Sequence, residues 1–132
     1  RVVGQYSGMS SNYFYLDETL IHNALANIGK QMKLVTVASG DVFVTKNDDK
    51  HRRAKEFGAD ICEMELAGIA IACERNNVPL FSVKVVSDKA DEGANVSFLS
   101  IVEKGVAGYE KILPEILKAI KDGATALPPI KN

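Results

Sequence analysis

The spacing of apolar and polar residues along this chain predicts its helices. In DETLIHNALANIGKQ, apolar side chains recur at i, i+1, i+4, i+5 and i+8, which predicts an amphipathic helix with Asp17 near its start. The segment KNDDKHRRAKEFG is strongly polar and ends at Gly58, which predicts an exposed helix with a C-terminal glycine stop. These two segments therefore define the first and second predicted helices.

Two further helices follow from the second half of the chain. ELAGIAIACERNN is built of small residues, which is typical of a helix that packs closely on a sheet. FLSIVEKGVAGYEKILPEILKAIKD has the pattern of a long amphipathic helix, and Pro114 within it predicts a kink or a local break.

Short runs that favour strands separate the helices. They are KLVTVASG, ADICEM and PLFSVKVVS, of which the last is rich in β-branched residues and predicts a strand buried on both faces. The order helix, strand, helix, strand, helix, strand, helix predicts an α/β fold with three layers, α/β/α. We expect a mostly parallel sheet covered by helices on both sides, in a single domain over residues 1–132.

Composition and charge narrow the class of protein. The chain has 132 residues, 46% apolar and 25% charged, which is typical of an ordinary globular domain. The net charge is −1 and no block of like charges occurs, so we expect no nucleic-acid and no membrane partner. Cys62 and Cys73 lack metal-ligand spacing, so we interpret them as buried thiols in a reducing compartment and expect a cytoplasmic protein.

Acidic residues occur where the predicted strands end. Glu63 and Glu65 lie between a strand and the next helix, and Ser87 and Asp88 follow another strand. The segment SGDVF follows a third strand. Because ligands of open α/β sheets bind beyond the carboxyl ends of the strands, we expect these groups to converge on one rim of the sheet.

Structural interpretations compete with this one for each residue taken singly. Glu65 at a helix N-terminus is a favourable dipole partner, and a Ser-Asp pair after a strand is a common helix cap. Glu63 can hold a backbone loop or a neighbouring cation, and Phe43 alone is more often a core residue. Their occurrence at three successive predicted strand ends favours a ligand site.

Three of these segments also resemble a known family. ASGDVFV, CEMELAGIAIAC and VVSDKAD, in this order and at these intervals, resemble motifs of the nucleoside phosphorylase and nucleosidase superfamily. The combination of SGDxF with SDxAD is most similar to the 5′-methylthioadenosine/S-adenosylhomocysteine nucleosidases. The early segment GQYSGMSSNYFYLDETLI resembles a loop of the same branch, so the likeness covers nearly the whole chain.

The resemblance implies a role for each binding residue. Glu65 matches the ribose-binding glutamate, whose two oxygens accept hydrogen bonds from the 2′- and 3′-hydroxyls. Met64 is expected to pack against the sugar. Phe43 is expected to stack on the purine, with the backbone of Val44 reading the polar edge of the base. The expected ligand is therefore a small purine nucleoside, bound without a metal or an organic cofactor.

For catalysis, the resemblance points to Asp88. An acid that donates to purine N7 improves the leaving group as the ribosyl ring becomes oxocarbenium-like. Ser87 is expected to orient that carboxylate, whose pKa burial would raise. Glu63 is expected to support the site near Lys84, where the nucleosidases usually carry arginine and its planar fork.

Other features of the resemblance bear on the whole protein. Family members carry N-terminal strands and a water-activating glutamate that nothing in residues 1–132 matches, so we expect the C-terminal portion of a longer enzyme, inactive by itself. The resemblance also implies a homodimer, with the loop around Ser7 reaching the neighbour's 5′-substituent pocket. The alternatives are a purine nucleoside phosphorylase, which differs in its nucleophile, and a nucleoside-binding fragment without catalysis.

Overall fold

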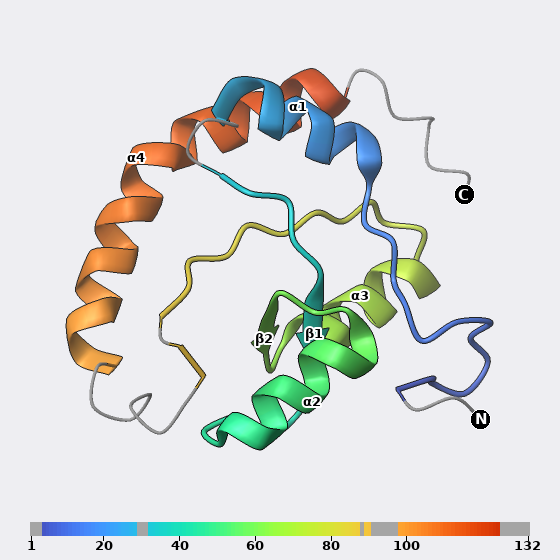
Figure 1. The fold of residues 1–132 in the computed structure, drawn as a ribbon. Coiled ribbons are helices and arrows are strands. Elements are labelled where there is room, and N and C mark those ends of the chain that lie inside the picture. Colours follow the sequence, from blue (N-terminus) through green and yellow to red (C-terminus); the bar gives the residue numbers. More distant parts are fainter. Residues whose placement is uncertain (1–3, 29–31, 88, 91–97, 125–132) are drawn as a thin grey trace.

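The structure is a computed structural model that describes residues 4–28, 32–87, 89–90 and 98–124. It contains helices and short strands, which alternate from α1 to α3 and are followed by a long final helix (Figure 1). In chain order the elements are α1 (Glu18–Ile28), β1 (Val37–Ser39), α2 (Asn47–Phe57), β2 (Ile61–Glu63), α3 (Leu66–Arg75) and α4 (Phe98–Ala124). All four predicted helices are present, so the helical part of the prediction is confirmed within these residues.

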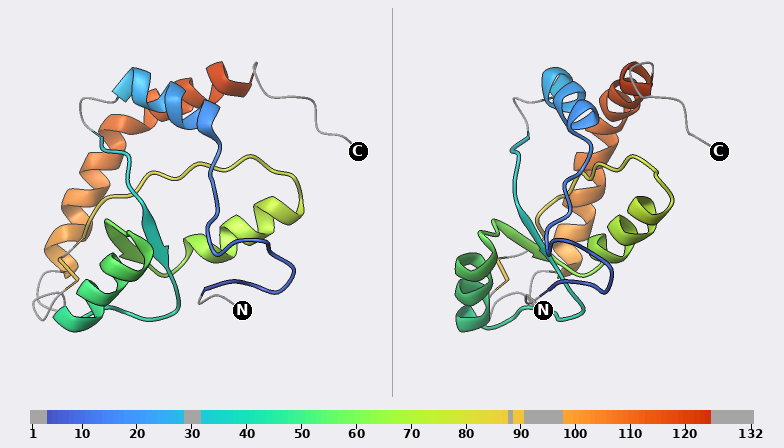
Figure 2. Two further views of the ribbon diagram at one scale, coloured as in Figure 1. Left: turned by 45° about the vertical axis from the view of Figure 1, so that its right-hand side comes forward. Right: turned by 90° about the vertical axis from the view of Figure 1, so that its right-hand side faces the viewer.

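The strands β1 and β2 form a parallel pair whose register sets the rim of the sheet. Val37 pairs with Ile61, and Ser39 pairs with Glu63. The helix α2 connects the two strands, as a parallel pair requires. Figures 1 and 2 show α2 and α3 on opposite sides of the strands. The chain is therefore an α/β protein with a parallel sheet, as predicted.

The structure does not contain the third predicted strand, within PLFSVKVVS, so this prediction is wrong for the described residues. Residues 79–87 run as an extended segment to which no strand is assigned, and Figure 1 shows it crossing the molecule as a long coil. Two of its carbonyls accept from groups outside any ladder, Leu80 from the Asp17 N–H at 2.7 Å and Val83 from the Tyr109 hydroxyl at 3.1 Å. A strand exists only with a neighbour to pair with, and within the described residues no strand lies in register beside this segment.

Local sequence signals fix the ends of the first two helices. The Asp17 carboxylate accepts a hydrogen bond from the Leu20 N–H at 2.8 Å, which caps the start of α1. Gly58 ends α2 with φ of 59° and ψ of 28°, a left-handed conformation that glycine adopts without a steric penalty. Both predicted boundaries are confirmed.

The helices α1 and α4 pack against each other, which Figures 1 and 2 both show. Each contributes buried residues, which are Leu20 and Ala24 from α1 and Ile116 and Ala119 from α4. Pro114 lies inside α4, which continues through it as one helix and curves over its length (Figure 1). Proline removes one backbone hydrogen bond. The residues on both sides of Pro114 are nevertheless helical, so the helix is not broken there.

Apolar side chains are also exposed in a stripe along α4. They recur at intervals of three or four residues, so they lie on one face of the helix. They are Val102, Val106, Tyr109, Leu113, Leu117 and Ile120. The cysteines differ from the prediction, since Cys62 and Cys73 are half-buried rather than fully buried, and neither forms a disulfide. No described helix combines the length and hydropathy needed to cross a membrane.

Candidate functional site

The rim of the sheet brings together two of the three predicted strand ends. Ser39 and Glu63 are the last residues of β1 and β2, and the parallel register places them side by side. The helix α3 begins three residues after Glu63, at Leu66. Polar side chains from both strands therefore meet the N-terminus of a helix, as the sequence predicts for this edge.

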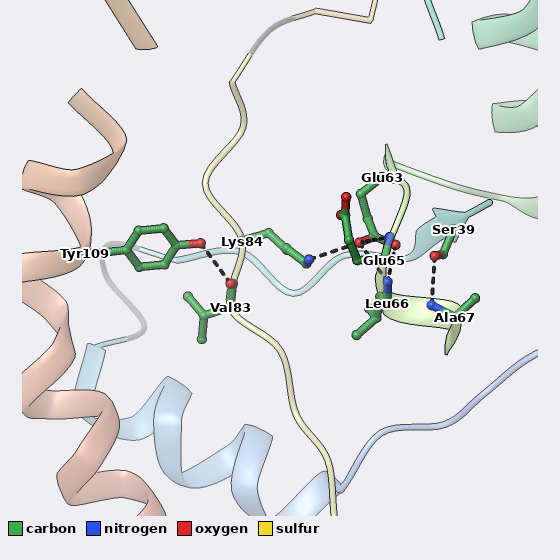
Figure 3. Close-up of polar contacts among 8 residues, drawn as sticks. All are labelled: Ser39, Glu63, Glu65, Leu66, Ala67, Val83, Lys84 and Tyr109. Atoms are coloured by element: carbon green, nitrogen blue, oxygen red, sulfur yellow. Dashed lines mark hydrogen bonds and ion pairs between the residues drawn. The ribbon is translucent and has the colours of Figure 1, made fainter. Parts of the chain in front are cut away.

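Glu63 is the most highly connected side chain at the rim (Figure 3). Its carboxylate accepts from the Leu66 N–H at 2.9 Å and from the Glu65 N–H at 3.1 Å. It also accepts from the Lys84 ammonium at 3.0 Å, and only 12% of the Glu63 side chain is exposed. The prediction that Glu63 lies near Lys84 is confirmed, and so is the interpretation that it holds a backbone loop and a cation.

These contacts change the acidity of Glu63. Burial alone would raise the pKa of its carboxyl group, but hydrogen bonds from Ser39, Lys84 and the backbone of Leu66 and Glu65 outweigh burial. Together they lower the pKa from its ordinary 4.5 to about 2. Glu63 is therefore a permanent anion near neutral pH, unsuited to donating a proton.

Ser39 completes the cap of α3. Its hydroxyl oxygen accepts from the Ala67 N–H at 2.8 Å, and its proton is donated to the Glu63 carboxylate. Two side chains from strand ends thus satisfy the first N–H groups of the helix, which have no partner within it. Sequence reasoning gave Ser39 no role, although it belongs to the SGDVF segment that was assigned to the rim.

Glu65 has a different status from Glu63. It occupies the N-cap position of α3, but its side chain makes no capping hydrogen bond, because Glu63 and Ser39 already cap the helix. The Glu65 side chain is exposed at the rim. The carboxylate is therefore not used for capping, although its position at the helix N-terminus still suits a dipole partner.

The predicted base and sugar contacts lie in the loops that follow the strands. Phe43 follows β1 and is exposed, so it is not a core residue here. Met64, between β2 and α3, is also exposed, whereas the Val44 side chain is buried. A buried Val44 side chain is compatible with readout by its backbone, which was the predicted role of this residue.

The predicted catalytic pair lies at the end of the extended segment. Ser87 is exposed, and Asp88 lies outside the described residues. Lys84, three positions before Ser87, reaches Glu63 at the rim and joins this segment to the strand ends. Tyr109 of α4 binds Val83 of the same segment at 3.1 Å, and sequence analysis offered no signal for this contact.

A separate cavity lies at the other end of α3. Its volume is about 430 Å³, and it lies between the loop of residues 9–17, the C-terminal half of α3 and residues 78–80. None of the predicted site residues that the structure describes lines it. Among the described residues, no cluster of three or more His, Cys, Asp or Glu side chains is arranged to hold a metal ion.

Known proteins are similar to this chain in sequence and in fold. Residues 7–120 match the model of the phosphorylase superfamily. An aminodeoxyfutalosine nucleosidase of Helicobacter pylori is 36% identical over 100 residues, which cover 72% of this chain and 43% of that protein. A 5′-methylthioadenosine/S-adenosylhomocysteine nucleosidase of Buchnera aphidicola is 33% identical, over 86% of this chain and 52% of that protein.

A solved structure extends the likeness to three dimensions. It is the 5′-methylthioadenosine/S-adenosylhomocysteine nucleosidase of S. pneumoniae with a transition-state inhibitor, with a TM-score of 0.79 and 28% identity. The match covers 89% of this chain and 52% of that one, so the chain spans about half the length of the proteins it resembles. The chain belongs to the phosphorylase superfamily, and these three relatives are nucleosidases.

Proposed function

We propose that the protein carrying this chain is a purine nucleosidase. It hydrolyses the N-glycosidic bond of 5′-methylthioadenosine or S-adenosylhomocysteine and releases adenine and a 5-thioribose product. The observation that carries the proposal is the division of labour between two neighbouring glutamates. The Glu63 carboxylate already binds Lys84 and the backbone at the start of α3, whereas the Glu65 side chain is exposed and makes no capping hydrogen bond.

In this proposal Glu65 binds the ribose. A carboxylate with two acceptor oxygens suits the two vicinal hydroxyls of a ribose, and charge-assisted hydrogen bonds are strong. Met64 and Phe43 lie in the loops that follow β2 and β1, and both side chains are exposed. Both are therefore available to contact an apolar surface of the ligand. Met64 packs on the sugar, Phe43 stacks on the purine, and the Val44 backbone reads the base.

Asp88 is the proposed general acid. Cleavage of the bond to the base leaves negative charge on the purine, and a proton at N7 neutralises that charge in the transition state. Ser87 orients the carboxylate, and Glu63 supports the site through Lys84 rather than by touching the reacting atoms. The support for Asp88 is the VVSDKAD segment and its resemblance to the family.

A second candidate substrate has a specific observation in its favour. The 36% identical relative from Helicobacter pylori is an aminodeoxyfutalosine nucleosidase. Aminodeoxyfutalosine is therefore the alternative ligand of the same rim.

Several properties of the whole protein belong to the proposal as well. The nucleophile is water, with phosphorolysis as the alternative, and the assembly is a homodimer in the cytoplasm. The 132 residues alone bind a nucleoside at most, because they span about half the length of the relatives. A nucleoside-binding protein without catalysis is the remaining alternative.

The test is an assay of free-base release from each nucleoside, with and without phosphate. We expect base release from 5′-methylthioadenosine or aminodeoxyfutalosine without phosphate. Asp88→Asn should lower kcat by about 10²- to 10⁴-fold, the usual contribution of a general acid. Glu65→Gln should lower kcat/KM by about 10- to 100-fold, because it weakens charge-assisted hydrogen bonds.

Glu74→Gln is the matched control, because it makes the same change at the other end of α3. It should leave base release unchanged. Strict dependence on phosphate would identify a phosphorylase, and nucleoside binding without any cleavage would identify the non-catalytic alternative.

A further inference from the structure

Ser39 links the end of β1 to the start of α3. Its hydroxyl oxygen accepts from the Ala67 N–H at 2.8 Å, and its proton is donated to the Glu63 carboxylate. The parallel register places Ser39 beside Glu63, and the Gly40 N–H donates to the Glu63 carbonyl at 3.1 Å. One side chain of β1 therefore contacts both the last residue of β2 and the helix that follows it.

The backbone that carries Glu65 is held by these contacts. The N–H groups of Glu65 and Leu66 donate to the Glu63 carboxylate at 3.1 Å and 2.9 Å. The next N–H along the chain, that of Ala67, donates to Ser39 (Figure 3). The Glu65 side chain makes no capping hydrogen bond of its own, so the position of this backbone determines which positions its carboxylate can reach.

The two side chains that hold this backbone can be separated experimentally. Glu63 also pairs with Lys84 at 3.0 Å, and removing the Ser39 hydroxyl leaves that ion pair in place. The same change leaves the Ala67 N–H without its acceptor in the first turn of α3, where N–H groups have no partner within the helix. A Ser39 variant therefore loosens the start of the helix and keeps the anion at the rim.

Recognition of a ribose at two points depends on the position of Glu65. One carboxylate accepts from both the 2′- and the 3′-hydroxyl only where its oxygens lie at hydrogen-bond distance from both groups. A 2′-deoxyribonucleoside offers one of these donors, so its binding depends less on the exact position of the carboxylate. A small displacement of Glu65 should therefore weaken the binding of ribonucleosides more than that of 2′-deoxyribonucleosides.

We propose that Ser39 is a positioning residue that gives the site its preference for ribonucleosides over 2′-deoxyribonucleosides. It acts through the start of α3, which it holds together with Glu63, and it does not touch the ligand. The inference rests on the proposed function in that Glu65 is the residue that binds the ribose. It places a determinant of sugar specificity on β1, outside the loops that contact the nucleoside.

Asp60 supplies a matched control at the opposite end of the strand pair. Its carboxylate accepts from the Thr36 N–H at 2.9 Å, so it also links the two strands through a side chain. Thr36 and Asp60 immediately precede β1 and β2, away from the rim. Asp60→Ala therefore tests whether any weakening of the strand pair is sufficient. Ser39→Thr is the conservative variant, because it keeps the hydroxyl on a side chain that suits a strand.

The first measurement is equilibrium binding to the full chain of the protein by isothermal titration calorimetry. The ligands are 7-deazaadenosine and 7-deaza-2′-deoxyadenosine, which have carbon in place of N7 and so resist cleavage by an acid at that position. The wild type should bind the ribonucleoside about 10- to 100-fold more tightly, the contribution of a hydrogen bond to a charged group. Ser39→Ala should lower this ratio by about three- to tenfold, whereas Ser39→Thr and Asp60→Ala should preserve it.

The second measurement is a double-mutant cycle with Glu65→Gln. Because Ser39 acts through Glu65, adding Ser39→Ala to the Glu65→Gln variant should change the ratio by less than about twofold. Additive effects of the two substitutions would overturn the inference.

The remaining outcomes separate this inference from the proposed function. A wild-type preference for the ribonucleoside that Ser39→Ala leaves intact would overturn the positioning role and leave the proposed function standing. An equal loss of preference in Asp60→Ala would likewise overturn it, because the effect would then come from the strand pair as a whole. A wild type that binds both nucleosides equally would overturn the ribose-binding role of Glu65 and this inference with it.

Discussion

Two groups of charged side chains in this molecule have similar distances and different surroundings. On α2, Arg52 pairs with Asp49 at 3.2 Å and with Glu56 at 3.5 Å. The exposed fraction of the side chain is 58% for Arg52, 43% for Asp49 and 35% for Glu56. At the rim, Glu63 pairs with Lys84 at 3.0 Å, with 12% and 30% of these side chains exposed.

The difference teaches that the partners beyond the ion pair decide its importance. The α2 charges face water and one another, so solvent screens them and each pair contributes little to stability. Glu63 also holds two backbone N–H groups and a hydroxyl, which lose their acceptor if the carboxylate is removed. An unsatisfied buried donor costs more than the hydrogen bond contributed.

The largest expected effect comes from removing the Glu63 carboxylate. Glu63→Ala should lower the free energy of unfolding by about 2–4 kcal/mol, because it removes a helix cap and leaves several donors without an acceptor. Glu56→Ala, which removes a carboxylate from the α2 cluster, should cost less than about 0.5 kcal/mol. Urea denaturation of both variants measures the difference, and similar midpoints would show that the two clusters are equivalent.

The pH dependence of stability sharpens the same comparison. The pKa of Glu63 is about 2 in the folded protein and 4.5 ordinarily, so the unfolded chain takes up the proton first as the pH falls. Its contribution is complete above about pH 4.5 and is lost toward about pH 2. From about pH 6 to about pH 3, the wild type should lose about 2 kcal/mol more than Glu63→Gln. Parallel curves for the two proteins would contradict the depressed pKa.

The smallest expected effect separates the two cations. Lys84→Met should cost about 1 kcal/mol, because it removes one of several donors from a largely buried carboxylate. Arg52→Met should cost less than about 0.5 kcal/mol, since both of its partners are exposed. Thermal denaturation at low and high salt checks this, and a larger loss for Arg52→Met would reverse the assignment of importance.

The sequence was most informative where the signal was local. Asp17 and Gly58 lie next to the helices that they begin and end, so their chemistry is visible within a few residues. The parallel pairing of β1 with β2 and the rim at their carboxyl ends followed from the order of elements. The family resemblance added the expected residue roles. It also placed Glu63 near Lys84, and the structure confirms that these two side chains are in contact.

The rest depended on contacts distant in the sequence. Whether PLFSVKVVS forms a strand depends on which strands lie beside it, and its composition does not contain that information. The partner of the Ala67 N–H lies 28 residues away, at Ser39. Tyr109 is 26 residues from Val83, and a tyrosine in an amphipathic helix gives no sign of such a partner. Only the three-dimensional arrangement could assign these contacts.

The crowded start of α3 also bears on the choice between water and phosphate. A helix N-terminus is a natural anion-binding site, because its first N–H groups and its dipole attract negative charge. Here the N–H groups of Glu65, Leu66 and Ala67 are already bonded to Glu63 and Ser39, and the Glu63 carboxylate itself is the resident anion. A phosphate ion would meet occupied donors and like charge at this helix. An enzyme that uses this rim for phosphorolysis must therefore bind its phosphate with other residues.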